Sequence, residues 1–214
     1  PLARSFALST KKGKEAWLEP IVSSFPAAGK GAGEKTVRFA VRSGSGKAPE
    51  GTVSRSGARC IVCGTPVALN HIRAEGKAGR MSAQLMAIVA EGMGGRVYLP
   101  PDPVHEKTAA SAQPAWKPDQ ELQGKCRVSV PLYGMNTFGD LFTPRQLTAL
   151  TAFCALVGEA RRKALEDARA RRDRDPQAYA DAVATYLAFA VDKAAAYWSG
   201  ICSWHNSGEK IRDT

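Results

Sequence analysis

The feature that most constrains this chain is a pair of cysteines, Cys60 and Cys63, followed at once by Gly64. A tight turn of this spacing aims two thiolates at one point, and the glycine lets the backbone fold beneath a metal ion. The pattern predicts a zinc knuckle with Cys60 and Cys63 as the metal ligands. A tetrahedral structural site needs four ligands, so the pair predicts only half of a zinc ribbon.

No second pair of this kind occurs in the sequence. Cys126, Cys154 and Cys202 each stand alone. His71 lies eight residues after the pair, outside the usual spacing of a zinc finger although still open as a ligand. Two other interpretations stay open, a redox dithiol and two inert buried thiols. A redox dithiol usually precedes a helix, whereas Thr65-Pro66-Val67 looks extended, and this favours metal binding.

Length and composition place the chain among globular proteins. At 214 residues, 44% of them hydrophobic, the chain can bury a core in one or two domains. Five cysteines without a secretory signal favour reduced thiols and a cytoplasmic location. No run of about 18 apolar residues occurs, so no membrane partner is expected. Because the chain begins with Pro1 and not with methionine, we expect it to be a piece of a longer protein.

Positive charge is concentrated in the first part of the chain. The net charge is +10, and residues 1–80 carry 14 Lys and Arg against 5 Asp and Glu. The remaining residues carry 16 against 15. A concentrated basic surface suits a polyanion, because each neutralised phosphate releases counterions. A surface that merely keeps the protein in solution is an equally open interpretation.

Residues 1–70 are predicted to form a small basic β module that resembles a zinc ribbon and needs metal or a neighbour for stability. A strand is expected around Pro20, which would confine it to a sheet edge. Residues 26–33 are expected to be a loop. A second strand alternates between apolar and basic residues, with one face formed by Val37, Phe39 and Val41 and the other by Arg38 and Arg42.

Residues 71–142 are predicted to form a bridge of mixed α and β character. Gly76 and Gly79 are expected to allow close approach of another backbone. The expected elements are a short helix at 81–91, a strand at 96–99, a surface loop at 105–119 and a weakly marked strand at 126–130.

Residues 143–214 are predicted to contain two long helices packed as an antiparallel hairpin. Thr143 and Gln146 fit a capping box, and Asp175-Pro176 signals the second start. The basic run at 169–174 is interpreted as a solvated helix end, with an acidic or nucleic-acid partner left open. The expected contact joins Leu147, Leu150, Phe153 and Val157 to Tyr186, Leu187 and Val191. The whole is expected to be an α+β fold.

Three parts of the sequence have a distinctive pattern: Arg59–Pro66 with Ile72–Met81, Tyr133–Met135 with Phe138–Leu147, and Glu209–Arg212. They resemble adenine-specific DNA methylases that carry a zinc-ribbon insertion. In that family the segment lies between the two halves of a Rossmann-like methyltransferase that uses S-adenosylmethionine. The resemblance implies that a first cysteine pair precedes Pro1, and that the two halves of the parent protein and DNA are partners.

The catalytic signature of that family is absent from this sequence. It is an Asp/Asn-Pro-Pro-Tyr/Phe loop that binds the flipped base, whereas the one Pro-Pro here is Leu99-Pro100-Pro101-Asp102. No glycine-rich cofactor loop is recognisable either. No residue is therefore assigned to catalysis or to cofactor binding. The chain is expected to contribute DNA-backbone binding and support to the parent enzyme. The predicted DNA contacts are Lys11, Lys12, Lys14, Arg38 and Arg42.

Two other functional classes remain. The first alternative is a zinc-binding adaptor that meets proteins through its helical hairpin. A hydrolase or nuclease is less favoured, because no paired carboxylates stand near a histidine. Glu75, Glu91 and Asp140 are scattered along the sequence, and each is expected to form an ordinary salt bridge.

Overall fold

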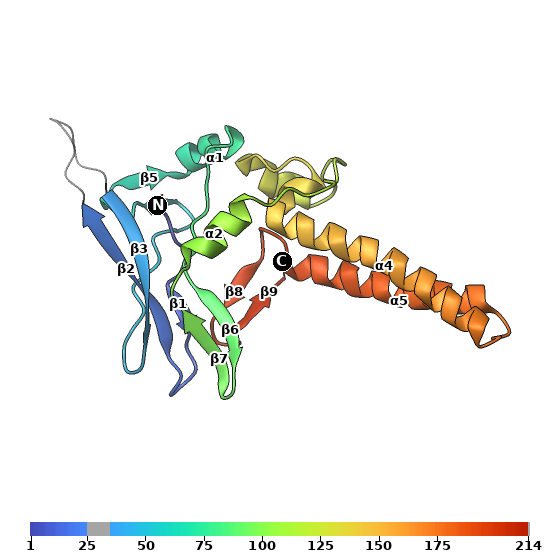
Figure 1. Cartoon of the computed structure of the whole chain (residues 1–214). Coiled ribbons are helices and arrows are strands. Elements are labelled where there is room, and N and C mark those ends of the chain that lie inside the picture. The colour runs from blue at the N-terminus through green and yellow to red at the C-terminus, as the bar shows by residue number, and fades with distance from the viewer. Residues whose placement is uncertain (25–34, 214) are drawn as a thin grey trace. The chain divides into compact units, whose positions relative to one another are not determined.

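The computed structural model describes residues 1–24 and 35–213, so the predicted loop at 26–33 lies outside the described residues. The chain forms two compact units. Small antiparallel sheets and a long pair of helices confirm the predicted α+β class (Figure 1). The first unit contains Pro1–Lys107, Gln123–Asn136 and Trp204–Lys210, and the second contains Thr108–Leu122, Thr137–Ser203 and Ile211–Thr214.

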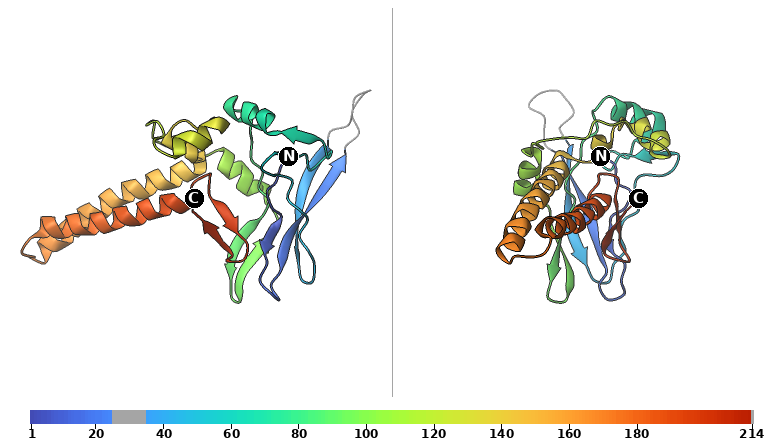
Figure 2. Two further views of the ribbon diagram at one scale, coloured as in Figure 1. Left: turned by 180° about the vertical axis from the view of Figure 1, so that it is seen from behind. Right: turned by 90° about the vertical axis from the view of Figure 1, so that its right-hand side faces the viewer.

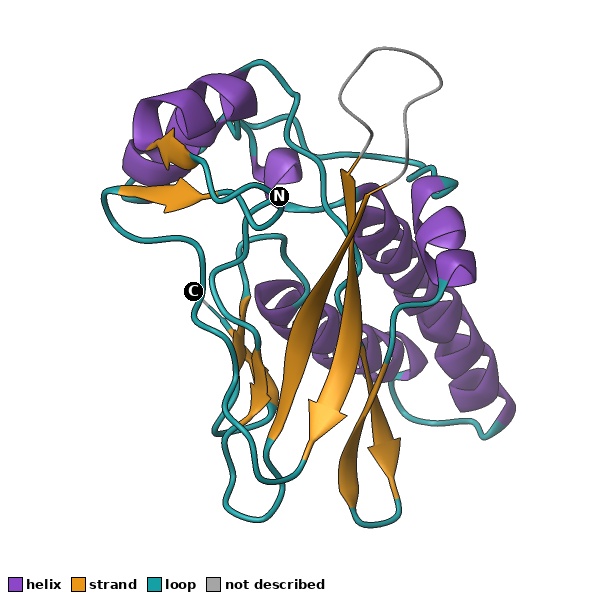
Figure 3. Cartoon of the chain, turned by 90° about the vertical axis from the view of Figure 1, so that its left-hand side faces the viewer, coloured by secondary structure: helices purple, strands orange, loops and turns teal. Residues whose placement is uncertain are grey.

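The first unit is built on a three-stranded antiparallel sheet in the order β1-β2-β3 (Figure 3). The predicted alternation along the third strand is confirmed, because Val37 and Phe39 are buried whereas Arg38 and Arg42 are exposed. The sheet therefore has one apolar face and one basic, solvated face. The strands are β1 (Ala7–Ser9), β2 (Ala16–Ser24) and β3 (Lys35–Ser43).

Pro20 lies where β2 has only one neighbouring strand. The N–H of Leu18 donates to the carbonyl of Phe6 at 2.8 Å, on the side of β1. Successive backbone N–H groups of a strand point to opposite sides, so the nitrogen of Pro20 points to the same side as that of Leu18. Pro20 lies beyond the end of β1 on that side. β2 is the central strand of the sheet, so the prediction of an edge strand is wrong for the strand as a whole. At Pro20 itself the missing N–H costs no ladder bond, because β1 has already ended there.

The apolar face of this sheet forms the main core of the first unit. The rings of Phe6 and Phe39 lie with their centroids 6.4 Å apart, and Phe6 is almost fully buried. Burial of such side chains is the dominant stabilising contribution. The core residues are Ala3, Phe6, Leu8, Ala16, Leu18, Val37 and Phe39, and the half-buried Val41, Ile61, Val62, Met86, Ala87 and Tyr98 pack against them.

Short hairpins and helices follow the sheet along the chain. They are β4 (Gly57–Arg59), β5 (Pro66–Ala68), α1 (Leu69–Lys77), β6 (Ile88–Gly92), β7 (Gly95–Leu99), α2 (Pro103–Ala110), α3 (Cys126–Ser129) and the 3-10 helix η1 (Val130–Tyr133).

Three local predictions in this region are wrong. The expected helix at 81–91 is absent: β6 pairs with β7 from Ile88 to Gly92, because strand pairing satisfies a β-branched run that precedes a glycine turn. The expected strand at 126–130 is instead α3 followed by η1. The expected loop at 105–119 contains most of α2, because Asp102 Oδ1 accepts a 2.8 Å bond from the N–H of Val104 and caps that helix. The strand expected at 96–99 is confirmed.

Gly76 allows the close backbone contact that the sequence predicted. A Cβ at Gly76 would lie 2.7 Å from the carbonyl oxygen of Tyr133, and one at Gly134 would lie 2.5 Å from the carbonyl oxygen of Gly76. Only glycine fits either position, and α1 and η1 pack together there. At Gly79 nothing lies within 4 Å of such a Cβ, so the prediction is wrong at that position.

The second unit contains the predicted helical hairpin. The left view of Figure 2 shows its two helices, α4 and α5, running side by side. Gln146 Oε1 accepts a 2.8 Å bond from the N–H of Thr143, and Asp175 Oδ1 accepts a 3.0 Å bond from that of Ala178. Both predicted helix starts are therefore confirmed. The elements are η2 (Phe138–Leu141), α4 (Pro144–Ala170) and α5 (Pro176–Tyr197). The strands β8 (Ser203–His205) and β9 (Lys210–Arg212) follow, and the segment Trp204–Lys210 belongs to the first unit.

The contact between the two helices differs in part from the predicted one. Leu147 and Leu150 are buried, but Phe153 is 45% exposed and Tyr186 is 77% exposed. Phe153 packs on the ring of Trp198 at 5.7 Å and lines an apolar groove between α4 and α5. We name this surface the hairpin groove. Val157, Leu187 and Val191 also line the hairpin groove, whereas Tyr186 does not.

Among residues 1–24 and 35–213, no helix is both long enough and apolar enough to cross a membrane.

Candidate metal centre and nucleic-acid interface

The Cys60–Cys63 knuckle lies at the end of the β4–β5 hairpin. Beyond the last pair of the two strands, the N–H of Cys60 donates to the carbonyl of Thr65 at 2.9 Å. The turn closes with a 2.9 Å bond from the N–H of Gly64 to the carbonyl of Cys60. Gly64 has a φ of 70°, in the left-handed region that favours glycine. The two-residue spacing and the glycine thus form the predicted tight turn.

The thiol of Cys60 is placed to become a thiolate. The pKa of Cys60 is lowered from its ordinary value of 9.0 to about 7, and the largest cause is a hydrogen bond from the backbone N–H of Cys63. Burial opposes this shift, whereas the N–H of Val62, the Cys63 thiol and the amino terminus contribute to it. Because the thiolate is the metal-binding form, backbone N–H groups directed at sulfur suit a metal ligand.

The two residues between the cysteines attach the knuckle to the sheet. Ile61 and Val62 pack against the buried face of β1–β3. The N–H of Ile61 also donates to the carbonyl of Pro1 at 2.9 Å. Any residue that precedes Pro1 in a longer protein therefore starts beside the knuckle.

The described residues supply two of the four ligands of a tetrahedral zinc site. Within residues 1–24 and 35–213, no group of three or more His, Cys, Asp or Glu side chains could hold a metal ion. His71, on α1, is thus not brought to the pair. Cys63 is exposed, with its Sγ 3.1 Å from Thr65 Oγ1. The donor set fits half of a structural zinc site. Cys126, Cys154 and Cys202 are free thiols.

One of the five predicted DNA contacts is held by a buried carboxylate. Lys11 Nζ donates to Oε2 of Glu209 at 2.5 Å, and the Glu209 side chain is only 8% exposed. Releasing Lys11 to a phosphate would leave this carboxylate without its cation, which is costly for a buried charge. Lys11 therefore has a structural task.

Two further predicted contacts have weaker partners. Lys14 Nζ donates to the carbonyl of Gly94 at 2.9 Å on an exposed surface. Arg42 Nη2 lies 2.6 Å from Oε2 of Glu19, and both side chains are about half exposed. An exposed pair of this kind contributes about 0–1 kcal/mol. A phosphate can therefore compete for either cation.

Lys12 and Arg38 are the two predicted contacts that remain free. Both side chains are exposed, and neither forms an ion pair or a hydrogen bond with a residue in the described part of the chain. Arg38 lies on the solvated face of β3, opposite Ile21. Lys12 lies in the turn between β1 and β2. These two cations are the most available to an anionic partner.

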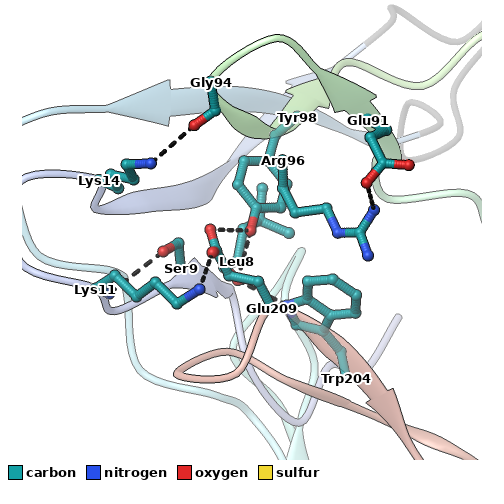
Figure 4. Close-up of polar contacts among 10 residues, drawn as sticks. All are labelled: Leu8, Ser9, Lys11, Lys14, Glu91, Gly94, Arg96, Tyr98, Trp204 and Glu209. Atoms are coloured by element: carbon teal, nitrogen blue, oxygen red, sulfur yellow. Dashed lines mark hydrogen bonds and ion pairs between the residues drawn. The ribbon is translucent and has the colours of Figure 1, made fainter.

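A polar cluster around Glu209 is the feature that sequence reasoning missed (Figure 4). Tyr98 OH donates to Oε1 of Glu209 at 2.9 Å, and Trp204 Nε1 donates to the carbonyl of Leu8 at 2.7 Å. The rings of Tyr98 and Trp204 meet edge to face at 6.4 Å. The cluster joins β1, β7 and the β8–β9 turn. No local pattern marks Glu209 as buried, because its partners lie far away in sequence.

The cluster shifts the titration of its members. The bond from Lys11, followed by those from Tyr98 and Ser9, lowers the pKa of Glu209 below its ordinary value of 4.5. Burial, aided by the bond to Glu209, raises the pKa of Tyr98 to about 12. The carboxylate is thus charged and the phenol neutral near neutral pH.

The scattered carboxylates form the salt bridges that the sequence analysis expected. Glu75 pairs with Arg80 at 2.7 Å, Glu91 with Arg96 at 3.4 Å, and Asp140 with Lys117 at 2.6 Å. The Pro-Pro segment joins β7 to α2. These carboxylates therefore have basic partners that serve the fold.

The chain was compared with protein-family models, with curated proteins and with solved structures, and none of them matches it. Function is therefore inferred from the knuckle, from the distribution of charge and from the stretches that resemble the methylases.

Proposed function

We propose that this chain is the DNA-backbone-binding and supporting segment of an adenine-specific (N6) DNA methyltransferase. The observation that carries the DNA-binding part is the pair of exposed cations Lys12 and Arg38, which have no ion-pair partner among the described residues. Both lie within residues 1–80, which hold most of the excess of basic over acidic residues. The methyl-transfer part rests on the resemblance of the three stretches. Catalysis and S-adenosylmethionine binding are assigned to the two halves of the parent protein.

Zinc belongs to the same proposal. Cys60 and Cys63 would hold it together with a second pair from residues upstream of Pro1. The support is the hydrogen bonding of the Cys60 thiol and the position of Pro1 at the knuckle. A bound zinc ion supplies structure and no chemistry here, because a closed site leaves no open coordination position.

The salt dependence of DNA binding tests this proposal. Each phosphate contact contributes about 0.9 to the slope of log K against log salt concentration. The double variant Lys12→Ala/Arg38→Ala should therefore lower the slope by about two, with little change in sequence preference. The measurement is fluorescence anisotropy with a short labelled duplex over a range of salt concentrations.

Arg80→Ala is the matched control. It removes one exposed positive charge, but Arg80 is engaged by two hydrogen bonds to Glu75, of 2.7 and 2.8 Å. The slope should stay unchanged in this variant. An unchanged slope in the Lys12→Ala/Arg38→Ala variant would show that the basic surface serves only to keep the protein in solution.

The alternative function is a zinc-binding adaptor that meets proteins through the helical hairpin. The observation that favours it is the hairpin groove, along which Phe153, Leu156 and Leu187 are 45%, 51% and 38% exposed. The same titration separates the two functions. Binding of duplex DNA with a steep salt dependence supports the DNA-binding segment, and its absence supports the adaptor.

A further inference from the structure

The end of the α4–α5 hairpin carries a cluster of arginines. We name residues 169–174 the hairpin tip. They contain Arg169, Arg171, Arg172 and Arg174, with Asp173 as the only acidic residue among them. Arg171 is engaged, because its Nη2 lies 2.9 Å from Asp173 Oδ2 and its guanidinium lies over the ring of Tyr179 at 5.3 Å.

The other three arginines of the hairpin tip are free. Arg169, Arg172 and Arg174 are exposed, and none forms a side-chain hydrogen bond or an ion pair within residues 1–24 and 35–213. Farther from the tip, Arg161 is paired with Asp181 and Arg162 with Glu166. Three exposed arginines without an ion pair among the described residues thus lie within six positions at the end of the hairpin.

The backbone of Arg172 gives an independent observation. Its φ is 57°, in the left-handed region. The N–H of Asp173 donates to the carbonyl of Ala168 at 3.0 Å, and that of Arg172 donates to the carbonyl of Arg169 at 3.0 Å, so α4 ends in a Schellman-type turn. Glycine is the favoured residue at this position, and a long side chain there is strained. A strained backbone that is retained at an exposed turn indicates that the Arg172 side chain has a function of its own.

We propose that the hairpin tip is a second phosphate-binding surface, at which Arg169, Arg172 and Arg174 contact the backbone of duplex DNA. Arginine suits this task, because its planar guanidinium binds two phosphate oxygens at once. The inference rests on the proposed DNA-binding function and adds to it a contact surface separate from Lys12 and Arg38. These residues would contact phosphates and not base edges, so the contact does not depend on the DNA sequence.

Arg172→Gly is the sharpest test, because the structural and functional interpretations predict opposite results. If the Arg172 side chain only ends the helix, the Arg172→Gly variant should bind DNA as tightly as the wild type does. If the side chain contacts a phosphate, the slope of log K against log salt concentration should fall by about one. The thermal unfolding midpoint should stay the same or rise, since glycine relieves the left-handed conformation.

A second variant leaves this turn residue in place. Arg169→Ala/Arg174→Ala should lower the slope by about two, with an unchanged circular dichroism spectrum. Arg162→Ala is the control, because it removes one positive charge from the same helix about two turns before the tip, and its slope should equal that of the wild type. Unchanged slopes in both tip variants, with normal binding by the wild type, would overturn this inference alone. Absence of duplex binding by the wild type would overturn the proposed function as well.

Discussion

Glu209 is a buried carboxylate that accepts hydrogen bonds from two residues distant in the sequence, Lys11 and Tyr98. Its φ of 50° lies in the left-handed region, where a side chain other than glycine is held only by its surroundings. The surroundings here are the ammonium of Lys11 and the hydroxyl of Tyr98. A carboxylate with such partners is more stable charged than protonated. Glu209 therefore makes the stability of the first unit depend on pH.

We predict that acid weakens this contact. The pKa of Glu209 is lowered in the folded state, so its contribution is complete above 4.5, the ordinary value, and is lost as the pH falls through the lower folded value. The unfolding midpoint of the wild type in urea should fall on acidification below pH 4.5 by more than that of Glu209→Gln.

Glu19→Gln is the control for this prediction. Glu19 also pairs with a basic residue, Arg42, but both side chains are about half exposed. Its variant should lose as much stability in acid as the wild type does. Equal acid sensitivity of the wild type and Glu209→Gln would show that other groups cause the effect.

At the scale of elements, the β4–β5 hairpin holds the cysteine pair that we propose as half of a zinc site. Its turn is closed by backbone bonds and packed on the sheet through Ile61 and Val62. We predict that residues 1–214 alone do not bind zinc in a one-to-one ratio. A chain extended at its amino terminus by its natural upstream residues should bind one zinc ion and lose it in the Cys60→Ser variant.

Elemental analysis of the purified proteins measures the zinc content per chain and so tests this prediction. Cys202→Ser is a suitable control, because Cys202 is a free thiol in the second unit. One zinc ion per chain in residues 1–214, retained after Cys60→Ser, would contradict the half site.

The α4–α5 hairpin gives a prediction of stability. A buried phenylalanine loses about 3–5 kcal/mol on replacement by alanine. Phe153 is 45% exposed, so Phe153→Ala should cost only about 1–2 kcal/mol. Leu150→Ala should cost more, about 2–5 kcal/mol, because Leu150 is buried. Urea unfolding measures both, and equal costs would show that Phe153 is covered by another molecule in solution.

Elements with a local signal were predictable from sequence, and elements that depend on distant pairing were not. The cap residues Thr143 and Asp175 mark the observed starts of α4 and α5. The same kind of signal at Asp102-Pro103 begins α2, but the polar residues that follow led to a loop prediction. β6 forms only because β7 pairs with it, and its apolar residues fit a helical spacing equally well.

At the scale of the whole molecule, the fold class and the residue types of the candidate site were predictable. The cysteine pair and the basic strand can be recognised by their spacing alone. The sequence does not show which cations are engaged, because Lys11 meets a residue 198 positions away and Tyr98 meets the same residue 111 positions away. Such partners are set by packing. Only the structure shows that, of the five candidate DNA contacts, Lys11 is held by a buried carboxylate, whereas Lys12 and Arg38 have no such partner among the described residues.

The bond between Lys11 and Glu209 has a consequence for biosynthesis. A ribosome releases β1, β2 and β3 long before Glu209 exists, and the entropy cost of closing a loop grows with its length. Residues 204–210 therefore dock last onto the first unit. Until then, water must solvate the carbonyl of Leu8 and the hydroxyl of Tyr98. Resistance of this unit to proteases thus begins only after residues 204–210 have emerged, well after its sheet has done so.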